Sequence, residues 1–186
     1  MFSKIPTKIN GFYEILPKVS EDLRGIFVKT YQETNFLSIG LGVQWKEQYY
    51  SISKKGVLRG LHFQIPPHAH QKLVYCLIGE VIDVAVDLRI NSPTYGQHEF
   101  VRLSAEKRNG VFIDVGLAHG FYTTSESAML LYNVSTIYEP SLDTGIRWDS
   151  VGINWGNINP IISVRDSSFI EFNQFSSPFL SSGNEG

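Results

Sequence analysis

The stretch KLVYCLIGEVIDVAVDL, residues 72–88, decides the fold class of this chain. It contains two apolar runs, residues 72–78 and 81–88, which meet at Gly79 and Glu80. Short apolar runs bounded by a glycine turn are typical of buried β-strands. We therefore predict two strands joined as a β-hairpin that is buried on at least one face.

The rest of the chain repeats this pattern on a smaller scale. Through the first 165 residues, short apolar-alternating runs are separated by glycine and proline, and helical periodicity is weak. This arrangement predicts an all-β sandwich or barrel. We expect one short helix within residues 32–41, and further strands within residues 11–16, 22–31, 44–53, 98–103, 111–115, 120–124 and 128–138.

The C-terminal part has a different character. From residue 141 the chain is irregular, and we expect Trp148 and Trp155 to pack as a closing flap. Residues 176–186 are rich in serine, glycine and asparagine, which predicts a frayed end. Since no repeat or long linker divides the chain, we predict a single domain over residues 1–186.

The composition is that of a soluble globular protein. Of the 186 residues, 42% are hydrophobic and 18% are charged, which suits one domain with a substantial core. A net charge of −2 without a basic cluster argues against a nucleic-acid partner. The single cysteine, Cys76, lies in an apolar run, so we expect a buried thiol and no disulfide. No signal peptide or membrane-length apolar run is visible, so we expect a cytoplasmic protein without a membrane partner.

The stretch GVLRGLHFQ, residues 56–64, combines a strand pattern with reactive side chains. Simple alternation would send Arg59 and His62 to opposite faces. Glycine inside a strand suggests a bulge or a close backbone approach to a ligand, and a twist at Gly60 could bring both side chains into one cavity. The alternative is a core histidine beside a surface arginine.

Two further histidines, His68 and His70, alternate in a proline-rich loop. A transition-metal site needs three or four ligands, and no acidic residue stands at a suitable spacing. We therefore predict no metal site and regard both histidines as solvated.

Other candidates carry weaker signals. His119 follows Gly116 and precedes Gly120, where the backbone can approach a ligand closely. Tyr132 and Tyr138 are six residues apart within one predicted strand, which places them on one face. Alone, each tyrosine could equally be a packed aromatic residue, and Arg165 with Asp166 could be a surface pair.

Taken together in their order, several motifs resemble those of one family. The motifs are Asp22-x-Arg24-Gly25-x-Phe27, GVLRGLHFQ at 56–64, KLV at 72–74, GEVxDVAVDLR at 79–89, SPTYG at 92–96, LSAE at 103–106, AHGF at 118–121, and Tyr132. Over residues 10–166 they resemble the dTDP-4-dehydrorhamnose 3,5-epimerases of deoxysugar biosynthesis. The resemblance implies a cupin-type double-stranded β-barrel, or jelly roll, that forms a homodimer and uses neither a metal nor a cofactor.

The resemblance also implies a reaction and a set of residues. The reaction is epimerisation at C3, C5 or both of a nucleotide-linked 4-keto-6-deoxy sugar. His62 would be the base, Asp166 its partner, Tyr132 the opposing acid and Lys72 the cation facing the enolate oxygen. Substrate binding would involve Arg24, Phe27, Glu47, Gln48, Arg59, His119, Tyr138, Asp143 and Arg165. Arg24 and Arg59 would contact phosphate or sugar oxygens, and Tyr138 would stack on the base.

The chain departs from the family pattern around this set. It carries Glu47-Gln48-Tyr49 where the family has a Gln-acid-Asn run. Lys29 stands where the family has an acidic residue, and Asn133 and Arg165 stand where it has lysine. Asp114-Val115 stands where a proline is expected before Gly116. These changes leave the nucleotide and the number of epimerised carbons open.

Two other function classes are consistent with the same fold. One is a non-catalytic cupin that binds a sugar nucleotide, and the other is a cofactor-free isomerase that moves the keto group along the ring. The four acid–base residues favour an enzyme, since a binding protein needs no acid and base on opposite sides of a cavity.

Overall fold

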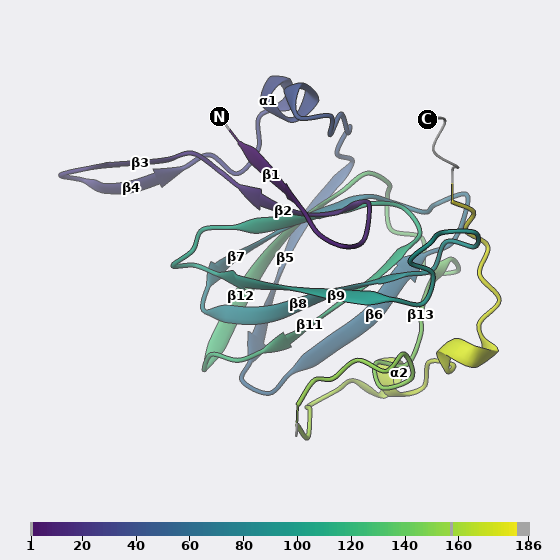
Figure 1. The fold of residues 1–186 in the computed structure, drawn as a ribbon. Coiled ribbons are helices and arrows are strands. Elements are labelled where there is room, and N and C mark those ends of the chain that lie inside the picture. Colours follow the sequence, from purple (N-terminus) through teal and green to yellow (C-terminus); the bar gives the residue numbers. More distant parts are fainter. Residues whose placement is uncertain (1, 157, 182–186) are drawn as a thin grey trace.

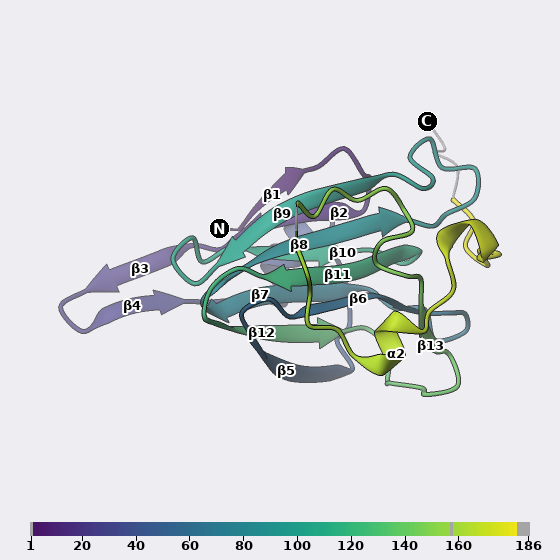
Figure 2. The same ribbon diagram turned by 90° about the horizontal axis from the view of Figure 1, so that it is seen from below.

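A computed structural model describes residues 2–156 and 158–181. The strands form a six-stranded sheet in the order β1-β2-β10-β7-β12-β5, a five-stranded sheet in the order β13-β6-β11-β8-β9, and a two-stranded ribbon of β3 and β4. Every named strand pair is antiparallel. Figures 1 and 2 show the two large sheets facing each other, so the all-β prediction is confirmed.

The strand bounds place the expected β-segments as follows. The six-stranded sheet contains β1 (Ser3–Pro6), β2 (Phe12–Leu16), β10 (Gly110–Ile113), β7 (Lys72–Ile78), β12 (Ser127–Val134) and β5 (Glu47–Lys54). The five-stranded sheet contains β13 (Asp143–Gly145), β6 (Leu58–Gln64), β11 (Leu117–Thr123), β8 (Glu80–Asp87) and β9 (His98–Ser104). The ribbon pairs β3 (Val19–Asp22) with β4 (Gly25–Val28), and the helices are α1 (Glu33–Ser38), α2 (Val164–Ser167) and the 3₁₀ turn η1 (Phe172–Gln174).

The predicted hairpin at residues 72–88 is wrong, although both of its strands exist. Strand β7 pairs with β10 and β12, whereas β8 pairs with β11 and β9. At Gly79 (φ +75°) the chain therefore passes from one sheet to the other, and a Cβ there would lie 2.0 Å from the Ser127 carbonyl oxygen. A tight glycine turn between two apolar runs is compatible with either arrangement, so the local pattern could not separate them.

The core has one layer between the sheets, one outside the five-stranded sheet, and one outside the six-stranded sheet around Phe36. The inner layer includes Phe12, Val74, Ala85, Phe121 and Leu130. The outer layer packs the even-numbered side of β8 against the chain that follows β13, and its members include Val84, Val86, Ile146, Trp155 and Phe179. Figure 2 shows this later segment crossing the strands of the five-stranded sheet. The expected flap containing Trp148 and Trp155 is thus confirmed.

The expected frayed end does not begin at residue 176. Phe179 is only 4% exposed and packs edge-to-face against Phe63, with ring centroids 5.8 Å apart. Ile90 donates its N–H to the Phe179 carbonyl and accepts one from Ser181, both at 2.9 Å. Composition missed this attachment because the anchoring contacts come from distant strands and loops. Residues 182–186 of the predicted frayed end lie outside the described residues.

The β3–β4 ribbon projects away from the two sheets (Figure 1). Its side chains are largely exposed, including Leu23, Ile26 and Phe27. Within the described ranges, no helix is long and apolar enough to cross a membrane.

Candidate active site

A bulge in β6 brings Arg59 and His62 to the same side of the five-stranded sheet. His62 pairs with His119 on β11, and Arg59 pairs with Phe121. Three residue steps on β6 therefore oppose two on β11, which is the count of a β-bulge. The sequence prediction of a bulge that unites Arg59 and His62 is confirmed.

Gly60 makes this geometry possible. Its φ is +126°, and a Cβ there would lie 2.5 Å from the Cα of Gly120. A side chain at this position would collide with the neighbouring backbone in a region that L-residues rarely occupy. Gly60 therefore lets the backbone of β6 lie close to the backbone of β11 at Gly120.

An inner cavity of about 190 Å³ lies between the two sheets. One wall comes from β5, β7 and β12, and the other from β6 and β11. Its lining residues are Tyr49, Ser51, Arg59, His62, Lys72, His119, Phe121 and Tyr132. Three of the four predicted acid–base residues, His62, Lys72 and Tyr132, line this cavity, and the fourth, Asp166, contacts His62.

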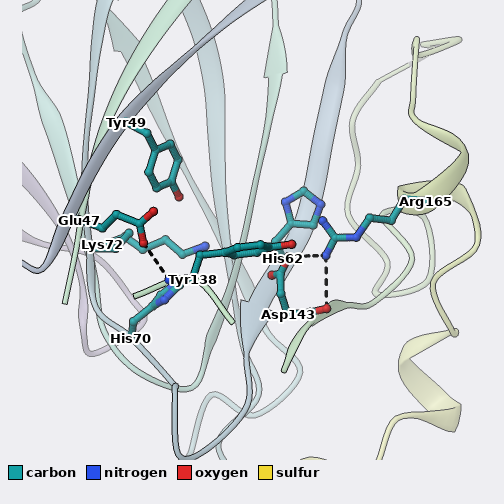
Figure 3. A pocket seen from close by; sticks show the side chains of 9 residues that line it. Glu47, Tyr49, His62, His70, Lys72, Tyr138, Asp143 and Arg165 are labelled. Carbon is teal, nitrogen blue, oxygen red and sulfur yellow. Dashed lines mark hydrogen bonds and ion pairs between the residues drawn. The ribbon is translucent and has the colours of Figure 1, made fainter. Parts of the chain in front are cut away.

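An outer pocket of about 350 Å³ adjoins the inner cavity, since both are lined by Tyr49, His62 and Lys72. Its other lining residues are Glu47, His70, Val134, Tyr138, Asp143 and Arg165. Figure 3 shows Glu47, Lys72 and His70 on one side, and His62, Asp143 and Arg165 on the other. The two chambers together form one continuous site.

His62 is coupled to a buried carboxylate. Its Nε2 lies 3.0 Å from Oδ1 of Asp166, whose side chain is 5% exposed. The other oxygen of Asp166 accepts the Gly60 N–H at 3.0 Å, and the Asp166 N–H is capped by Ser163 Oγ at 3.0 Å. Burial raises the pKa of Asp166, but the contacts with His62 and Gly60 outweigh it and lower the pKa to about 2. Asp166 is therefore an anion that orients the imidazole.

A second histidine–carboxylate pair lies beside the first. His119 Nε2 is 2.8 Å from Asp83 Oδ2, and both residues are buried. Burial raises the pKa of Asp83, and burial lowers the pKa of His119 against the opposing pull of Asp83. The pair fixes the His119 ring in the wall opposite Lys72 and Tyr132.

Lys72 places a cation in both chambers. The residue is 7% exposed, and burial lowers the pKa of its ammonium group to about 8, against the attraction of Asp143 and Asp83. No acidic oxygen of the described residues lies within ion-pair distance of it. Its charge is therefore available to an anionic group in the cavity.

Tyr132 supplies a protonated hydroxyl to the same cavity. It is 6% exposed, and burial raises the pKa of its phenol well above the usual value of 10. Its hydroxyl lies 3.5 Å from Ser51 Oγ. Tyr138 does not share its strand, because β12 ends at Val134; the predicted common face for the two tyrosines is wrong.

The remaining predicted residues divide into two groups. Arg59 lines the inner cavity and donates its Nε–H to Ser53 Oγ at 3.0 Å. In the outer pocket, Glu47 accepts the Tyr138 N–H at 2.8 Å, and Arg165 pairs with Asp143 at 2.6 Å.

The second group lies outside both chambers of this chain. Gln48 donates to Asn133 Oδ1 at 2.7 Å and lines neither chamber. Arg24 pairs with Asp22 on the β3–β4 ribbon, and Phe27 lies on the same ribbon. The structure therefore does not bring Arg24, Phe27 or Gln48 to the site of their own chain.

Several residues of the site were not predicted from the sequence, among them Asp83, Tyr49 and His70. Asp83 and Tyr49 were not identified as site residues, and the prediction that His70 is solvated is wrong. His70 lines the outer pocket, and its Nδ1 lies 3.0 Å from Gln64 Nε2. Burial, and to a lesser extent the nearby charges of Lys72 and His119, lowers the pKa of His70 to about 3. Two features of the sequence could have indicated these residues. Asp83 is a lone aspartate in an apolar strand, and Gln64, the partner of His70, follows His62 by two residues.

Within residues 2–156 and 158–181, no group of three or more His, Cys, Asp or Glu side chains is placed to hold a metal ion. That no metal is needed stays a prediction.

Comparison with known proteins places this site in a family. A sequence model of the dTDP-4-dehydrorhamnose 3,5-epimerase family matches residues 6–174. A dTDP-4-dehydrorhamnose 3,5-epimerase of Salmonella typhimurium is 44% identical over 172 residues, which are 90% of this chain and 94% of the relative. A dTDP-4-dehydrorhamnose 3-epimerase of Streptomyces niveus is 38% identical over 164 residues, covering 87% of this chain and 79% of the relative.

A solved structure agrees with these sequence matches. The dTDP-6-deoxy-D-glucose-3,5-epimerase of Legionella pneumophila, crystallised with dTDP-4-keto-L-rhamnose, superposes with a TM-score of 0.90 at 35% identity, covering 95% of each chain. The fold is thus the predicted cupin-type jelly roll. With the family match over most of its length and three of the predicted acid–base residues around one cavity, this chain belongs to the dTDP-4-dehydrorhamnose 3,5-epimerase family.

Proposed function

We propose that this epimerase acts on a dTDP-linked 4-keto-6-deoxy sugar, with His62 as base and Tyr132 as acid. The observation that carries the proposal is the position of these two side chains on opposing sheets around one cavity. Inversion of a carbon centre requires a proton to leave from one face and return from the other. A solved relative was crystallised with dTDP-4-keto-L-rhamnose, which supports the substrate class.

The reaction begins with proton abstraction beside the C4 keto group. The carbonyl acidifies the C–H bonds at C3 and C5, because the resulting carbanion is delocalised onto the C4 oxygen as an enolate. His62 Nε2 lies 3.0 Å from Asp166 Oδ1, so the carboxylate favours the tautomer with its proton on Nε2 and a lone pair on Nδ1. Nδ1 takes the proton, and Asp166 stabilises the imidazolium that forms.

The enolate is held by Lys72 and reprotonated by Tyr132. A preorganised cation facing a developing oxyanion in a buried cavity is usually a large catalytic contribution. Tyr132 stays protonated because burial raises its pKa. Its O–H then donates a proton to the carbon from the sheet opposite His62, which inverts the configuration.

The two chambers suit the two parts of the substrate. Arg59 and His119 in the inner cavity offer N–H donors to sugar or phosphate oxygens. Tyr138, which is 52% exposed beside the outer pocket, offers a ring on which a nucleotide base can stack. Glu47, Asp143 and Arg165 at the outer pocket contact the nucleotide periphery.

We infer that two copies of the chain assemble as a dimer. Tyr50, Ile52 and Leu77 expose apolar surface on the six-stranded sheet, being 65%, 56% and 43% exposed. Large exposed apolar patches mark interaction surfaces, and a two-fold dimer would cover the same patch on both copies. The projecting ribbon then carries Arg24 and Phe27 to the site of the second copy, and Gln48 lies beside that interface.

Subunit mixing tests the dimer directly. Arg24→Ala and His62→Asn variants should each be nearly inactive alone, and refolding them together should restore activity through hybrid dimers with one complete site. If mixing restores nothing and each variant sediments as a monomer, the dimer proposal is wrong. A cytoplasmic location stays a prediction.

Isotope exchange tests the proposed reaction. The protein is incubated with dTDP-4-keto-6-deoxyglucose in deuterated water, and C3 and C5 are followed by NMR. We expect deuterium at C3, at C5 or at both, together with inversion. Binding without exchange would indicate a non-catalytic cupin. Movement of the keto group from C4 to another ring carbon would indicate a keto-isomerase. Either result contradicts the proposal.

A further inference from the structure

Tyr49 is stacked directly on Tyr132. The two residues are register partners on the antiparallel pair β5 and β12. Their ring centroids are 4.9 Å apart and their planes differ by 17°. Cross-strand aromatic pairs of this kind stabilise one relative orientation of the rings.

Few polar contacts hold the Tyr132 ring in place. Its hydroxyl has one polar neighbour among the described residues, Ser51 Oγ, at the long distance of 3.5 Å. His119 contacts the ring at its edge, with centroids 6.3 Å apart and planes at 67°. The direction of the Tyr132 hydroxyl therefore depends mainly on packing, and Tyr49 covers one face of the ring.

Tyr49 also occupies the boundary of the site. It lines both the inner cavity and the outer pocket, and it is 43% exposed. Burial, with Glu47 and Asp143 adding, raises the pKa of its phenol to about 12, so the ring is neutral at physiological pH. A neutral phenol at this boundary can support Tyr132 without competing with an anionic substrate for the Lys72 cation.

We propose that Tyr49 is a positioning residue that holds the Tyr132 phenol in the direction required for proton return. It acts through the stacked ring, and its own hydroxyl takes no part in proton transfer. The inference rests on the proposed role of Tyr132 as the acid. Loss of the stack should let the Tyr132 ring turn, so that proton abstraction by His62 continues while inversion becomes slow.

The test compares exchange with inversion in deuterated water for Tyr49→Phe, Tyr49→Leu and Tyr49→Val. Tyr49→Phe keeps the stack and should keep the wild-type ratio of inversion to exchange. Tyr49→Leu and Tyr49→Val should lower inversion about tenfold to a hundredfold, the scale of a small misplacement of a catalytic group, while exchange changes by less than about threefold. Tyr95→Leu is the control, since Tyr95 is similarly exposed at 41% and packs on Phe172 away from the site.

Three outcomes would overturn the inference. If the aliphatic variants keep the wild-type ratio, or lose exchange and inversion by the same factor, Tyr49 does not position the acid. If Tyr49→Phe behaves like Tyr49→Leu, the hydroxyl acts itself. Tyr132→Phe is measured in parallel to distinguish a wrong role for Tyr49 from a wrong proposed function. If Tyr132→Phe still inverts the substrate at the wild-type rate, Tyr132 is not the acid and the proposed function of Tyr132 is wrong.

Discussion

His62 and Tyr132 approach one cavity from two different sheets, His62 from β6 of the five-stranded sheet and Tyr132 from β12 of the six-stranded sheet. Their backbones therefore form opposite walls of the site. In the proposed reaction, a substrate ring between these walls presents one face to the imidazole beside Asp166 and the other to the protonated phenol. The proposed two-sided proton transfer rests on this placement.

Removal of the base should stop turnover without preventing binding. We expect His62→Asn to lower kcat by about a hundredfold to ten-thousandfold, which is the usual contribution of a general base. Nucleotide affinity should change little, because the outer pocket has its own contacts. Steady-state kinetics and calorimetric titration with dTDP measure the two quantities, and a variant with wild-type exchange at both carbons would show that another group is the base.

Asp166 should matter for both catalysis and stability. Asp166→Asn keeps an acceptor for the Gly60 N–H but loses the charge that orients His62, so we expect kcat to fall about a hundredfold or more. The folded-state pKa of about 2 lies below the ordinary 3.8, so the stabilisation from ionised Asp166 is present above pH 4 and is lost as the pH falls towards 2. Urea unfolding should show the stability gap between wild type and Asp166→Asn shrinking over that range, and a constant gap would contradict this account.

Lys72 should set an alkaline limit on activity. Its pKa of about 8 means that the ammonium group loses its charge as the pH rises through 8. We therefore expect kcat/KM to fall above an apparent pKa near 8 in wild type. Lys72→Met should lower kcat about a hundredfold to a thousandfold, the usual cost of losing one oxyanion partner. A wild-type profile that stays flat to pH 9.5 would exclude a catalytic charge on Lys72.

Burial of the charged Lys72 side chain should also lower the stability of the fold. The folded-state pKa of Lys72 is lower than its ordinary 10.5, so burial of the charged form disfavours folding below pH 8, and the cost is relieved as the pH rises from 8 to 10.5. Lys72→Met should therefore be at least as stable as wild type at pH 7, with the difference shrinking at higher pH. Lys54→Met, at an exposed position on β5, serves as the control. A Lys72→Met protein that is clearly less stable at pH 7 would contradict this.

The bulge at Gly60 should be sensitive to a single methyl group. Gly60 and Gly25 share an unusual backbone, with φ of +126° and +115°, but only Gly60 has backbone atoms in the way of a Cβ. Gly25→Ala should cost about 1–3 kcal/mol from strain alone, whereas Gly60→Ala should add roughly 1–3 kcal/mol from overpacking. Chemical unfolding measures both, and equal losses would mean that the approach to Gly120 is unimportant.

The sequence was most informative where function restricts the residues. The motif at residues 56–64, with Lys72, Tyr132 and Asp166, predicted side chains that the structure brings together, and the glycine inside the strand predicted the bulge. Their placement around one cavity could be predicted because each prediction depends on a local feature or on an ordered run of motifs.

The pairing of distant residues could not be predicted in the same way. Residues 72–88 have the same local pattern whether β7 and β8 form a hairpin or belong to different sheets. Asp83 signals only that a buried carboxylate needs a partner, and it acquires His119 through the pairing of β8 with β11. Tyr49 and Tyr50 are adjacent aromatic residues, and only the register of β5 against β12 decides which one faces Tyr132.

The division of labour between His62 and Tyr132 is tested most directly by Tyr132→Phe. This change removes only the hydroxyl, so the stack on Tyr49 and the fold should be retained. The variant is incubated with dTDP-4-keto-6-deoxyglucose in deuterated water, and exchange and inversion at C3 and C5 are followed together by NMR. We predict that deuterium still enters from the His62 side while inversion falls at least about a hundredfold, the lower scale for loss of a general acid. A Tyr132→Phe variant in which exchange and inversion fall by the same factor, or in which neither falls, would contradict the account.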